Sequence, residues 1–583
     1  MLTEAVATGN PVATSRAGAN MTAGLVAALA GAPDGAVGVL EVDEAHLPAT
    51  IDAVAPVVIV LLNLSRDQLD RVSEVRLIAE RWRAALARSD AVVIANADDP
   101  LVVYATSDAH DVFYVGVGSH WHEDAHHCPR CNSRVDYEPG SGSSPSAGWS
   151  CVCGFARPVL DAWITDHGLS FADRDGVALE PGLPGRFNVA NAAMATIAAT
   201  VLGIPLKVGS VATSLVTEVE GRFSTIEING HTTRLLLAKN PAGFTELLEL
   251  VRHSPSTVVI GINSKIADGH DPSWLWDVPF ELLAGDRVIA TGERALDLAV
   301  RLVHAGVETV RQVDQRRAIA SAAEGGVDYI GNYTAFQELR RVGHRRATKS
   351  DGTTLTRHLV PVSRASMPDA SKLRIVIVHP DLLGTYGDGG NGRVLANRAR
   401  WRGIPVELID ATADSPLPER ADVYLLGGGE DGPQLASADA LRTGSLARAI
   451  DRGAVVLGVC AGYQILGHAF PAPDGSLHRG LGLLDVTTAR GAPRAVGETL
   501  VIREAIGPDR TLTGFENHGG RTTRGEGTSP LGRVIAGTGN GDGTDGAVSG
   551  RTIGTYLHGP VLARNPGLAD ELLSLAVGAP LPP

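Results

Sequence analysis

Cys460 has the surroundings that best suit a nucleophile in this sequence. It follows the apolar run "AVVLGV", which predicts a strand, and precedes "GYQILGHAF", which predicts a helix. Small neighbours leave a thiol at such a turn accessible, and the N-terminus of a helix favours a thiolate. The alternative is a buried cysteine of the core. Two other segments favour the nucleophile: the glycines of "YLLGGGEDGPQ" (424–434) offer N–H groups for an oxyanion hole, and His558 in "GTYLHGP" offers a base.

The other four cysteines predict a metal site. Cys128 and Cys131 are separated by two residues, Cys151 and Cys153 by one, and nineteen residues lie between the two pairs. This spacing allows four thiolates to surround one zinc ion, and such a closed site holds structure together without catalysing a reaction. The alternative is a set of unpaired surface thiols. Three nearby histidines are alternative ligands: His122, His126 and His127.

Polar side chains near the ends of predicted strands mark a third candidate site. Glu41 and Asp43 offer carboxylates, which suit Mg²⁺. Asn96 and Asp98 follow the run "AVVIA", at the carboxyl edge of a parallel sheet where nucleotides bind. For each residue alone, a solvated polar group in a loop is the simpler interpretation. Two further candidates for contact with adenine come from "LPGRFNVANAAMA" (183–195): Asn188 and Asn191.

The predicted elements that carry these residues alternate as in a parallel α/β fold. Over 37–115, apolar runs such as "VVIVLLNL" alternate with helix-like runs such as "SEVRLIAERWRAALARS". Residues 120–157 break this rhythm with His, Cys, Gly, Ser and Pro, which indicates an inserted module. We predict four parts in order: an α/β domain at 1–224 that contains the insert, a second Rossmann-like α/β domain at 225–345, a polar linker at 346–371, and a third α/β domain at 372–583.

Length and charge restrict the classes of function. A chain of 583 residues is long enough for several domains, and its net charge of −14 argues against nucleic acid as a partner. The longest apolar run, "AVAPVVIVLLNL", is shorter than the ~20 residues of a membrane span. The N-terminus lacks a basic-then-apolar signal sequence. We therefore expect a cytoplasmic protein with reduced thiols.

The segments "LGVCAGYQILG", "LLGGGEDGPQ", "ENHGGRT" (516–522) and "GTYLHGP" resemble, in order, class I glutamine amidotransferases of the cobyric-acid-synthase-like branch. The resemblance implies that Cys460 attacks the side-chain amide of L-glutamine and that His558 transfers the proton as ammonia leaves. It also implies glutamine binding by the glycines Gly428 and Gly429, and by Arg494 as a clamp for the carboxylate, with Arg490 as the alternative. One departure is Pro560, which stands where such enzymes carry a glutamate that orients the histidine.

The first half resembles the ATPase domain of Mur ligases through "LEVDEAHLP" (40–48), "ANADDP" (95–100) and "LPGRFNVANAAMA". With the four cysteines, "LLLAKNPAGF" (235–244) and "INSKIADGHDPSWLWDVPFE" (262–281) narrow the resemblance to the lipid II isoglutaminyl synthase family. That family joins a MurT-like ligase to a GatD-like glutaminase, usually as separate subunits, and here the two look fused. "TYGDGGN" (385–391) resembles the start of the GatD-like half. The resemblance implies ATP and Mg²⁺ at Glu41, Asn96, Asp98 and Asn191, and a structural Zn²⁺.

The resemblance implies that the acid that completes the Cys–His pair comes from the MurT-like half. The resemblance makes Asp268 the first candidate, followed by Asp271 and then Asp277. Ser264 and Lys265 stand where many relatives carry Asp-Asn, so the motif is altered at this point. The alternative role of Asp268 is to form a turn before Gly269.

The glycine-rich loop ending in Gly-Lys-Ser/Thr, with which Mur ligases hold phosphates, is not found in the sequence. The opening "MLTEAVATGNPVATSRAGANM" is similar to the segment that comes directly after that loop in Mur ligases. Either the start codon was assigned too far downstream, or this protein has lost the phosphate-binding loop. We expect residues 1–583 to bind ATP poorly.

The expected activity is ATP-dependent amidation of the D-glutamate α-carboxylate of lipid II, with ammonia from glutamine, in peptidoglycan synthesis. The expected partners are L-glutamine and lipid II, met at the inner face of the membrane. One alternative is a glutamine-dependent amidase of a cobyrinate-type carboxylate. The other is a glutaminase-only or binding protein.

Overall fold

The computed structural model describes residues 1–15, 19–65, 75–118, 125–138, 148–219, 222–323, 325–343, 357–359, 372–384, 387–503 and 510–582. They form two compact units. The first comprises the described residues within Met1–Asp67, Val72–Ser256 and Ala322–Arg346, and the second comprises those within Thr257–Ser321 and Ala347–Pro583. The predicted linker at 346–371 lies outside the described residues except for 357–359, and His122 also lies outside them.

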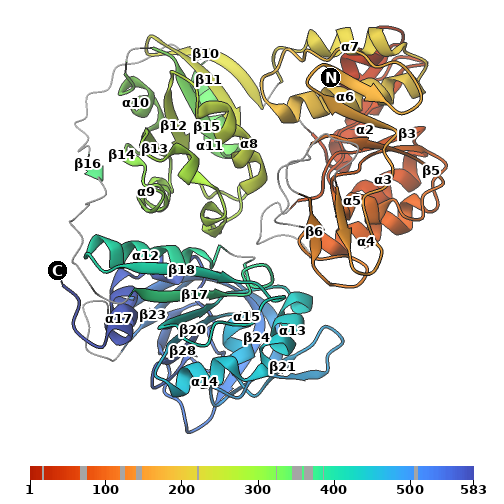
Figure 1. Cartoon of the computed structure of the whole chain (residues 1–583). Coiled ribbons are helices and arrows are strands. Elements are labelled where there is room, and N and C mark those ends of the chain that lie inside the picture. Colours follow the sequence, from red (N-terminus) through yellow and green to blue (C-terminus); the bar gives the residue numbers. More distant parts are fainter. Residues whose placement is uncertain are drawn as a thin grey trace. The chain divides into compact units, whose positions relative to one another are not determined.

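The first unit is built on a five-stranded sheet in the order β3-β4-β5-β8-β9 (Figure 1). The bounds of these strands are Val58–Leu61, Val92–Asn96, Asp111–Gly116, Ala162–Thr165 and Gly168–Phe171. The first four run parallel, and β9 returns antiparallel to β8. Val93 and Ala95 of β4 pack into one core with α4 (Val75–Leu86), and Ile94 packs into another with α6 (Arg186–Val201). Because successive side chains point to opposite faces, a strand covered on both sides must be apolar throughout.

The first unit also contains further helices and two other groups of paired strands. The helices are α1 (Leu2–Ala7), α2 (Thr22–Ala30), α3 (Leu47–Val54), α5 (Pro100–Ala105), α7 (Leu206–Ser214), α8 (Pro241–Val251) and α11 (Tyr333–Gly343). Strand β1 (Val12–Thr14) pairs in parallel with β2 (Val37–Val39). Strand β11 (His231–Leu237) pairs antiparallel with β10 (Phe223–Ile228) and parallel with β15 (Val327–Gly331).

Between β5 and β8, the segment predicted to be an insert contains a small two-stranded sheet of its own. Its strands β6 (Val135–Tyr137) and β7 (Trp149–Cys151) form a two-stranded antiparallel sheet, and Ser150 of β7 also bridges to Ala156. We call the described residues 125–138 and 148–157 the four-cysteine module. Trp149 and Phe155 of this module, 4.9 Å apart between ring centroids, are buried in the same core as β4 and α4.

The second unit contains a six-stranded sheet in the order β18-β17-β19-β20-β28-β27, shown in teal to blue in Figure 1. Its strands are Val406–Ala411, Leu373–Val378, Val423–Leu426, Val455–Val459, Thr552–Thr555 and Ala547–Ser549. All but β27 run parallel. The helices are α12 (Gly390–Trp401), α13 (Asp431–Ala440), α14 (Ser445–Asp451), α15 (Ala461–Leu466), α16 (Val561–Arg564) and α17 (Pro566–Val577).

A second sheet and a neighbouring parallel segment complete this unit. The long strands β23 (Val486–Ile502) and β24 (Thr511–Arg524) form an antiparallel pair. Around them lie β21 (Ala469–Pro471), β22 (Leu477–Arg479), β25 (Gly532–Ala536) and β26 (Thr544–Asp545). In the segment Thr257–Ser321, the parallel strands are β12 (Thr257–Gly261), β13 (Arg287–Thr291) and β14 (Glu308–Arg311), and β16 (Arg357–Leu359) pairs with β14. Its helices are η3 (Ser273–Trp276), η4 (Phe280–Leu283), α9 (Ala295–His304) and α10 (Gln315–Ala320).

Within the second unit, the segment Thr257–Ser321 packs directly on the larger α/β sheet. Trp276 of η3 belongs to the same buried core as Ile375 of β17. Asn397 of α12 donates a hydrogen bond to the carbonyl oxygen of His304, with a distance of 2.8 Å. Burial lowers the pKa of His304 to about 4, so this residue is a neutral packing group at neutral pH.

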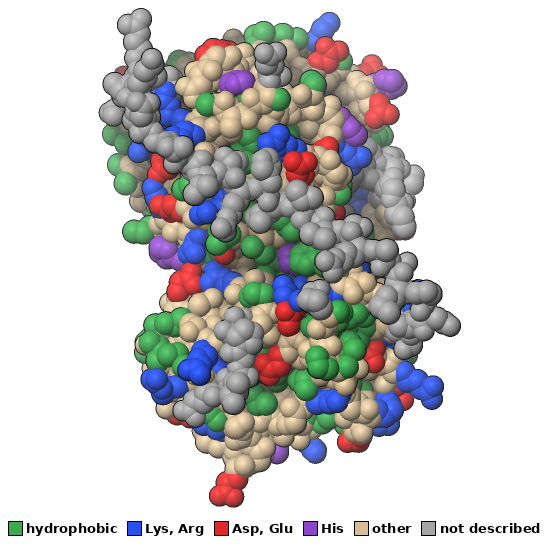
Figure 2. Space-filling view, turned by 90° about the vertical axis from the view of Figure 1, so that its left-hand side faces the viewer, with side chains coloured by type: hydrophobic (Ala, Val, Ile, Leu, Met, Phe, Trp, Pro, Cys, Tyr) green, Lys and Arg blue, Asp and Glu red, His purple; other side chains and the backbone are tan. Residues whose placement is uncertain are grey.

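Acidic and basic side chains are interspersed over the described surface that Figure 2 shows. In the described part of the chain, every helix is too short or too polar to cross a lipid bilayer.

Candidate active sites

Cys460 occupies a strained turn between β20 and α15. Its φ of 49° is positive, which is uncommon for a residue with a side chain. The turn is tight because Gly462 lies against the backbone of Leu426, where an added Cβ would stand 2.5 Å from the carbonyl oxygen. Two buried glycines, Gly458 and Gly462, therefore permit the geometry that presents the thiol at the edge of the sheet.

His558 lies beside this thiol at the end of β28. Burial alone would lower the pKa of His558, but Asp388 and Cys460 outweigh it and raise the pKa well above its ordinary value. Nδ1 of the imidazole is 3.1 Å from Oδ2 of Asp388, and both side chains are fully buried. A carboxylate at this nitrogen fixes the tautomer and stabilises the imidazolium, which is the role of the acid in a catalytic triad. The structure thus brings together a thiol, an imidazole and a carboxylate.

Asp388 also contacts the glycine-rich loop that follows β19. Its Oδ2 accepts a hydrogen bond of 2.7 Å from the N–H of Gly428. Gly427 permits this approach, because a Cβ there would stand 2.1 Å from the carbonyl oxygen of Leu383. Of the two predicted glycines, Gly428 donates to Asp388, which leaves Gly429 as the candidate donor of this loop to an oxyanion.

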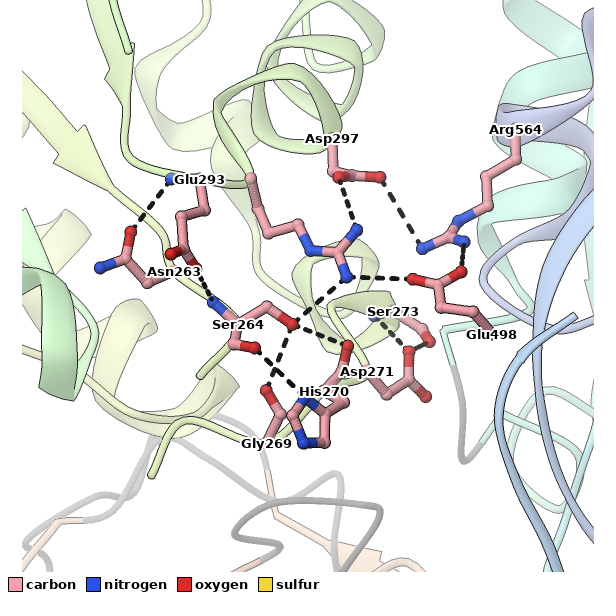
Figure 3. A network of polar contacts seen from close by, with 11 residues as sticks. Asn263, Ser264, Gly269, His270, Asp271, Ser273, Glu293, Asp297, Glu498 and Arg564 are labelled. Carbon is pink, nitrogen blue, oxygen red and sulfur yellow. Dashed lines mark hydrogen bonds and ion pairs between the residues drawn. The ribbon is translucent and has the colours of Figure 1, made fainter. Parts of the chain in front are cut away.

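The three aspartates expected from the MurT-like half have different surroundings. Asp268 lies in a turn, where its Oδ2 accepts a hydrogen bond of 3.2 Å from the N–H of Lys265. Asp271 is buried, and its Oδ1 accepts from the N–H of Ser273 (Figure 3). Burial raises the pKa of Asp271, while Ser273, His558 and Arg564 oppose the rise, so this carboxyl group lies within electrostatic reach of the imidazole. Asp277 directly follows η3. Burial lowers the pKa of the Arg301 guanidinium, and the negative charge of Asp277 partly opposes this effect.

A network of charges surrounds the Asp271 loop (Figure 3). Glu498 of β23 accepts from Arg294 at 3.0 Å and from Arg564 at 2.7 Å. Asp297 of α9 lies 3.9 Å from Arg564. These bonds join the segment Thr257–Ser321 to the elements that carry His558 within the second unit.

Arg494 lies on β23, where Asn517 of β24 orients it. Its Nε donates to Oδ1 of Asn517 at 2.7 Å, and its Nη2 donates to the carbonyl oxygen of the same residue at 3.2 Å. The alternative, Arg490, instead contacts Asp431 at 3.4 Å. Both arginines are exposed, so each remains able to meet a carboxylate.

We expect Arg494→Gln to raise KM for glutamine by roughly ten- to a hundredfold with a smaller change in kcat, because a charge-assisted pair to the substrate carboxylate is lost. The measurement is steady-state glutaminase kinetics. Arg490→Gln is the matched control and should change KM by less than about threefold. A larger effect of Arg490→Gln would assign the clamp to that residue.

The four cysteines converge in the module. Their sulfur atoms all lie within 4.8 Å of one another. The Cys128 and Cys153 sulfurs are 3.6 Å apart, and those of Cys131 and Cys151 are 3.4 Å apart. Tetrahedral zinc with Zn–S bonds of about 2.3 Å needs sulfurs about 3.8 Å apart, so the donor set fits a zinc ion.

Removing one thiolate should empty this site. We expect Cys151→Ser to lower bound zinc from about one ion per chain to nearly none and to lower the melting temperature, because three thiolates hold zinc much less firmly. Metal analysis and thermal melting check this. Cys460→Ser is the matched control, and it should keep its metal. Equal metal contents in the two variants would contradict the assignment.

The first unit contains a cavity of about 460 Å³ at the carboxyl edge of its sheet. It brings together three of the four residues predicted to bind nucleotide and magnesium: Glu41, Asn96 and Asn191. Asp43 and Asp99 add carboxylates for a hard cation. Its cationic side chains, which suit phosphate groups, were not predicted from the sequence, because they come from three separate segments: Arg186, Arg222 and Lys239.

Two predicted polar residues point elsewhere. Asn188 donates to the carbonyl oxygen of Pro184, just before its own helix, at 2.7 Å, and it does not line the cavity. Asp98 is buried behind the cavity wall, where Arg157 lies 2.6 Å from its Oδ1. Glu41 lines the cavity but forms an ion pair of 2.7 Å with Arg222.

A thiol at a strained turn, with its imidazole and carboxylate, is the arrangement of an enzyme that attacks a carbonyl carbon with cysteine, and glutamine amidotransferases are one such class. Comparison with known families agrees with this class. The CobB/CobQ-like glutamine amidotransferase domain matches residues 374–566, and the MurT ligase C-terminal domain matches residues 237–336.

The most informative relatives are the two subunits of one enzyme. The lipid II isoglutaminyl synthase subunit GatD of Staphylococcus aureus strain N315 is 38% identical over 201 residues, which cover 34% of this chain and 81% of that protein. The MurT subunit from strain COL is 28% identical over 345 residues, covering 55% of this chain and 78% of that protein. The chain belongs to the lipid II isoglutaminyl synthase family, with a MurT-like and a GatD-like region in one polypeptide. Among solved structures, a pseudomurein peptide ligase type C from Methanothermus fervidus has 20% identity and a TM-score of 0.46, covering 58% of this chain and 74% of that chain.

Proposed function

We propose that this protein transfers ammonia from L-glutamine to the α-carboxylate of D-glutamate in lipid II, at the expense of ATP. The observation that carries the proposal is the pairing, in one chain, of a GatD-like region that holds Cys460, His558 and Asp388 with a MurT-like region. The acceptor is taken from the name that both relatives carry. The product would be D-isoglutamine in the stem peptide of the cell-wall precursor.

The glutaminase half would release ammonia by covalent catalysis. The Cys460 sulfur attacks the amide carbon of glutamine, and His558 gives its proton to the departing nitrogen, so a thioester and ammonia form. Water, deprotonated by the same imidazole, then cleaves the thioester to glutamate and restores the thiol. Asp388 keeps the imidazolium in place through both steps.

The ligase half would activate the acceptor. A carboxylate resists attack by ammonia, so its oxygen takes the γ-phosphoryl group of ATP, and ADP leaves. Ammonia displaces phosphate from the acyl phosphate and forms the amide. Glu41 and Asp43 would hold Mg²⁺, which neutralises phosphate charge, and Arg186 and Lys239 face the same cavity.

Three finer points belong to this proposal. The ion in the four-cysteine module would be a structural Zn²⁺. The domain limits would be 1–224, 225–345 and 372–583. We place the reaction in the cytoplasm at the inner face of the membrane, because a lipid-linked acceptor would be presented there.

The test supplies lipid II, ATP and glutamine labelled with ¹⁵N at the side-chain amide, followed by mass spectrometry of the stem peptide. We expect one labelled nitrogen in the peptide and none with Cys460→Ser. Release of glutamate without label in the peptide would leave the glutaminase standing and refute lipid II as acceptor. A parallel reaction with a cobyrinate-type corrinoid tests the other amidase activity.

A further inference from the structure

The four-cysteine module holds the loop that borders the nucleotide cavity. We call residues 96–99, between β4 and α5, the nucleotide loop. Trp149 lies two positions before Cys151 in β7, and its indole Nε1 donates a hydrogen bond of 3.0 Å to the carbonyl oxygen of Ala97. The bond is buried, so water cannot replace it without opening the core.

A second, charged contact runs from the same module to the same loop. The Arg157 guanidinium lies 2.6 Å from Oδ1 of Asp98, and the two side chains are only 6% and 10% exposed. Asp98 in turn accepts hydrogen bonds from the N–H groups of Val117 and Gly118, at 2.8 and 2.6 Å. Val117 and Gly118 line the cavity. The ion pair therefore connects the module to two parts of the cavity wall.

The backbone is shaped to admit the Arg157 side chain. A Cβ at Gly116 would stand 2.6 Å from Nη2 of Arg157, and a Cβ at Gly148 would stand 2.7 Å from its Cδ. The N–H of Arg157 also donates to the carbonyl oxygen of Trp149 at 2.9 Å, which ties the two contacts together. A long charged side chain threaded between two glycines has few other positions to adopt.

We propose that Arg157 and Trp149 are positioning residues, through which the metal-loaded module sets the geometry of the nucleotide loop. The proposal rests on the proposed function, since ATP is the ligand of this cavity only under that function. Neither residue lines the cavity, so each acts through Ala97 or Asp98. Loss of the metal would loosen β7 and, with it, the wall at Val117 and Gly118.

The test uses the full chain with Arg157→Met, which removes the charge, and Trp149→Phe, which removes only the donor. Arg134→Met is the matched control, because Arg134 lies exposed on the same module. Zinc content, hydrogen exchange of peptides covering 95–101 and 115–118, and KM for ATP are measured. We expect full zinc content in all variants, with KM for ATP raised about tenfold by Arg157→Met, about threefold by Trp149→Phe and less than about twofold by Arg134→Met.

Hydrogen exchange decides the structural part of the proposal. Exchange at 95–101 and 115–118 should accelerate in Arg157→Met and in chelator-treated wild type, and glutaminase activity should stay unchanged. Unaltered exchange and KM in Arg157→Met would overturn the proposal. If Arg157→Met fails to fold, Trp149→Phe provides the test. Exchange rates in Trp149→Phe equal to those of the wild type would then overturn the proposal. Because poor ATP binding is expected from the sequence, ATP is supplied in large excess. A wild-type chain that still turns over no ATP would refute the proposed function, while hydrogen exchange would still test the positioning role.

Discussion

Replacing Cys460 with serine should abolish the release of ammonia from glutamine, by roughly 10⁴- to 10⁶-fold in kcat. A serine hydroxyl stays protonated at neutral pH beside an imidazole arranged for a thiolate, so the first bond to the amide carbon does not form. The exchange of sulfur for oxygen is nearly isosteric, and the buried turn should keep its shape. Glutamate production, followed in a coupled assay, measures the loss.

The same variant separates the two halves of the reaction. Added ammonium salt at alkaline pH supplies free ammonia, so Cys460→Ser should still amidate the acceptor with ATP. Retention of glutamine-dependent amidation in this variant would contradict the assignment of the nucleophile. Loss of ammonium-dependent amidation as well would indicate that the substitution damages the ligase half.

The second large effect is expected at Asp388. Asp388→Asn should lower kcat/KM for glutamine by about 10²- to 10⁴-fold, because the amide carries no charge to stabilise the His558 imidazolium. One acceptor oxygen remains in the asparagine for the N–H of Gly428. The glycine-rich loop should therefore stay ordered, and the loss should fall on the proton transfers. Steady-state kinetics with glutamine provide the number.

The pH dependence of kcat/KM distinguishes loss of the Asp388 charge from a purely structural defect, because only the former should shift the profile in a defined direction. Asp388 raises the pKa of His558, so the imidazolium that protonates the departing nitrogen persists to higher pH in the wild type. Removing the carboxylate lowers that pKa, and the alkaline limb of the kcat/KM profile should move to lower pH. Asp268→Asn is the comparison, since Asp268 is held in a turn, and it should leave the profile in place. A shift in Asp268→Asn alone would make that residue the third member of the triad.

Much of the fold can be predicted from patterns that act over short distances. The run "VVIAN" of β4 is apolar at every position but the last because helices cover both faces of the strand, and the sequence shows this directly. The four-cysteine insert is equally visible in the sequence, because two closely spaced pairs of cysteines in a protein with reduced thiols are typical of a metal site. Helix α15 and the turn at Cys460 are predicted by small residues beside a buried strand.

The third member of the proposed triad, Asp388, depends on contacts that sequence spacing does not encode. Asp388 lies 170 positions before His558, and the two meet because β17 and β28 lie in one sheet. Its motif, "TYGDGGN", is visible in the sequence, and the signal was an acid amid glycines just after the first strand of the domain. Near His558 in the sequence, the expected acid is replaced by Pro560, and the family resemblance then pointed to Asp268, Asp271 and Asp277, so Asp388 was not predicted.

Asp98 shows the opposite kind of limit. Its position after β4 correctly predicts the edge of the sheet where a cavity forms, but two adjacent polar residues there can face opposite ways. Arg157, 59 positions later, forms a buried ion pair with Asp98 and thereby directs the Asp98 side chain away from the cavity. Such a partner can be recognised only once the inserted module is folded against the sheet.

The packing of Thr257–Ser321 against the GatD-like region has a consequence for how this polypeptide came to be one gene product. Trp276, Asn397 and the Arg564–Asp297 pair already join the two parts without help from the connecting segment. A protease cut within 346–371 should therefore yield two fragments that elute together from a sizing column. The non-covalent contacts hold the two halves together. Fusion in one chain instead ensures that both halves are made in equal amounts and at a high effective concentration relative to each other.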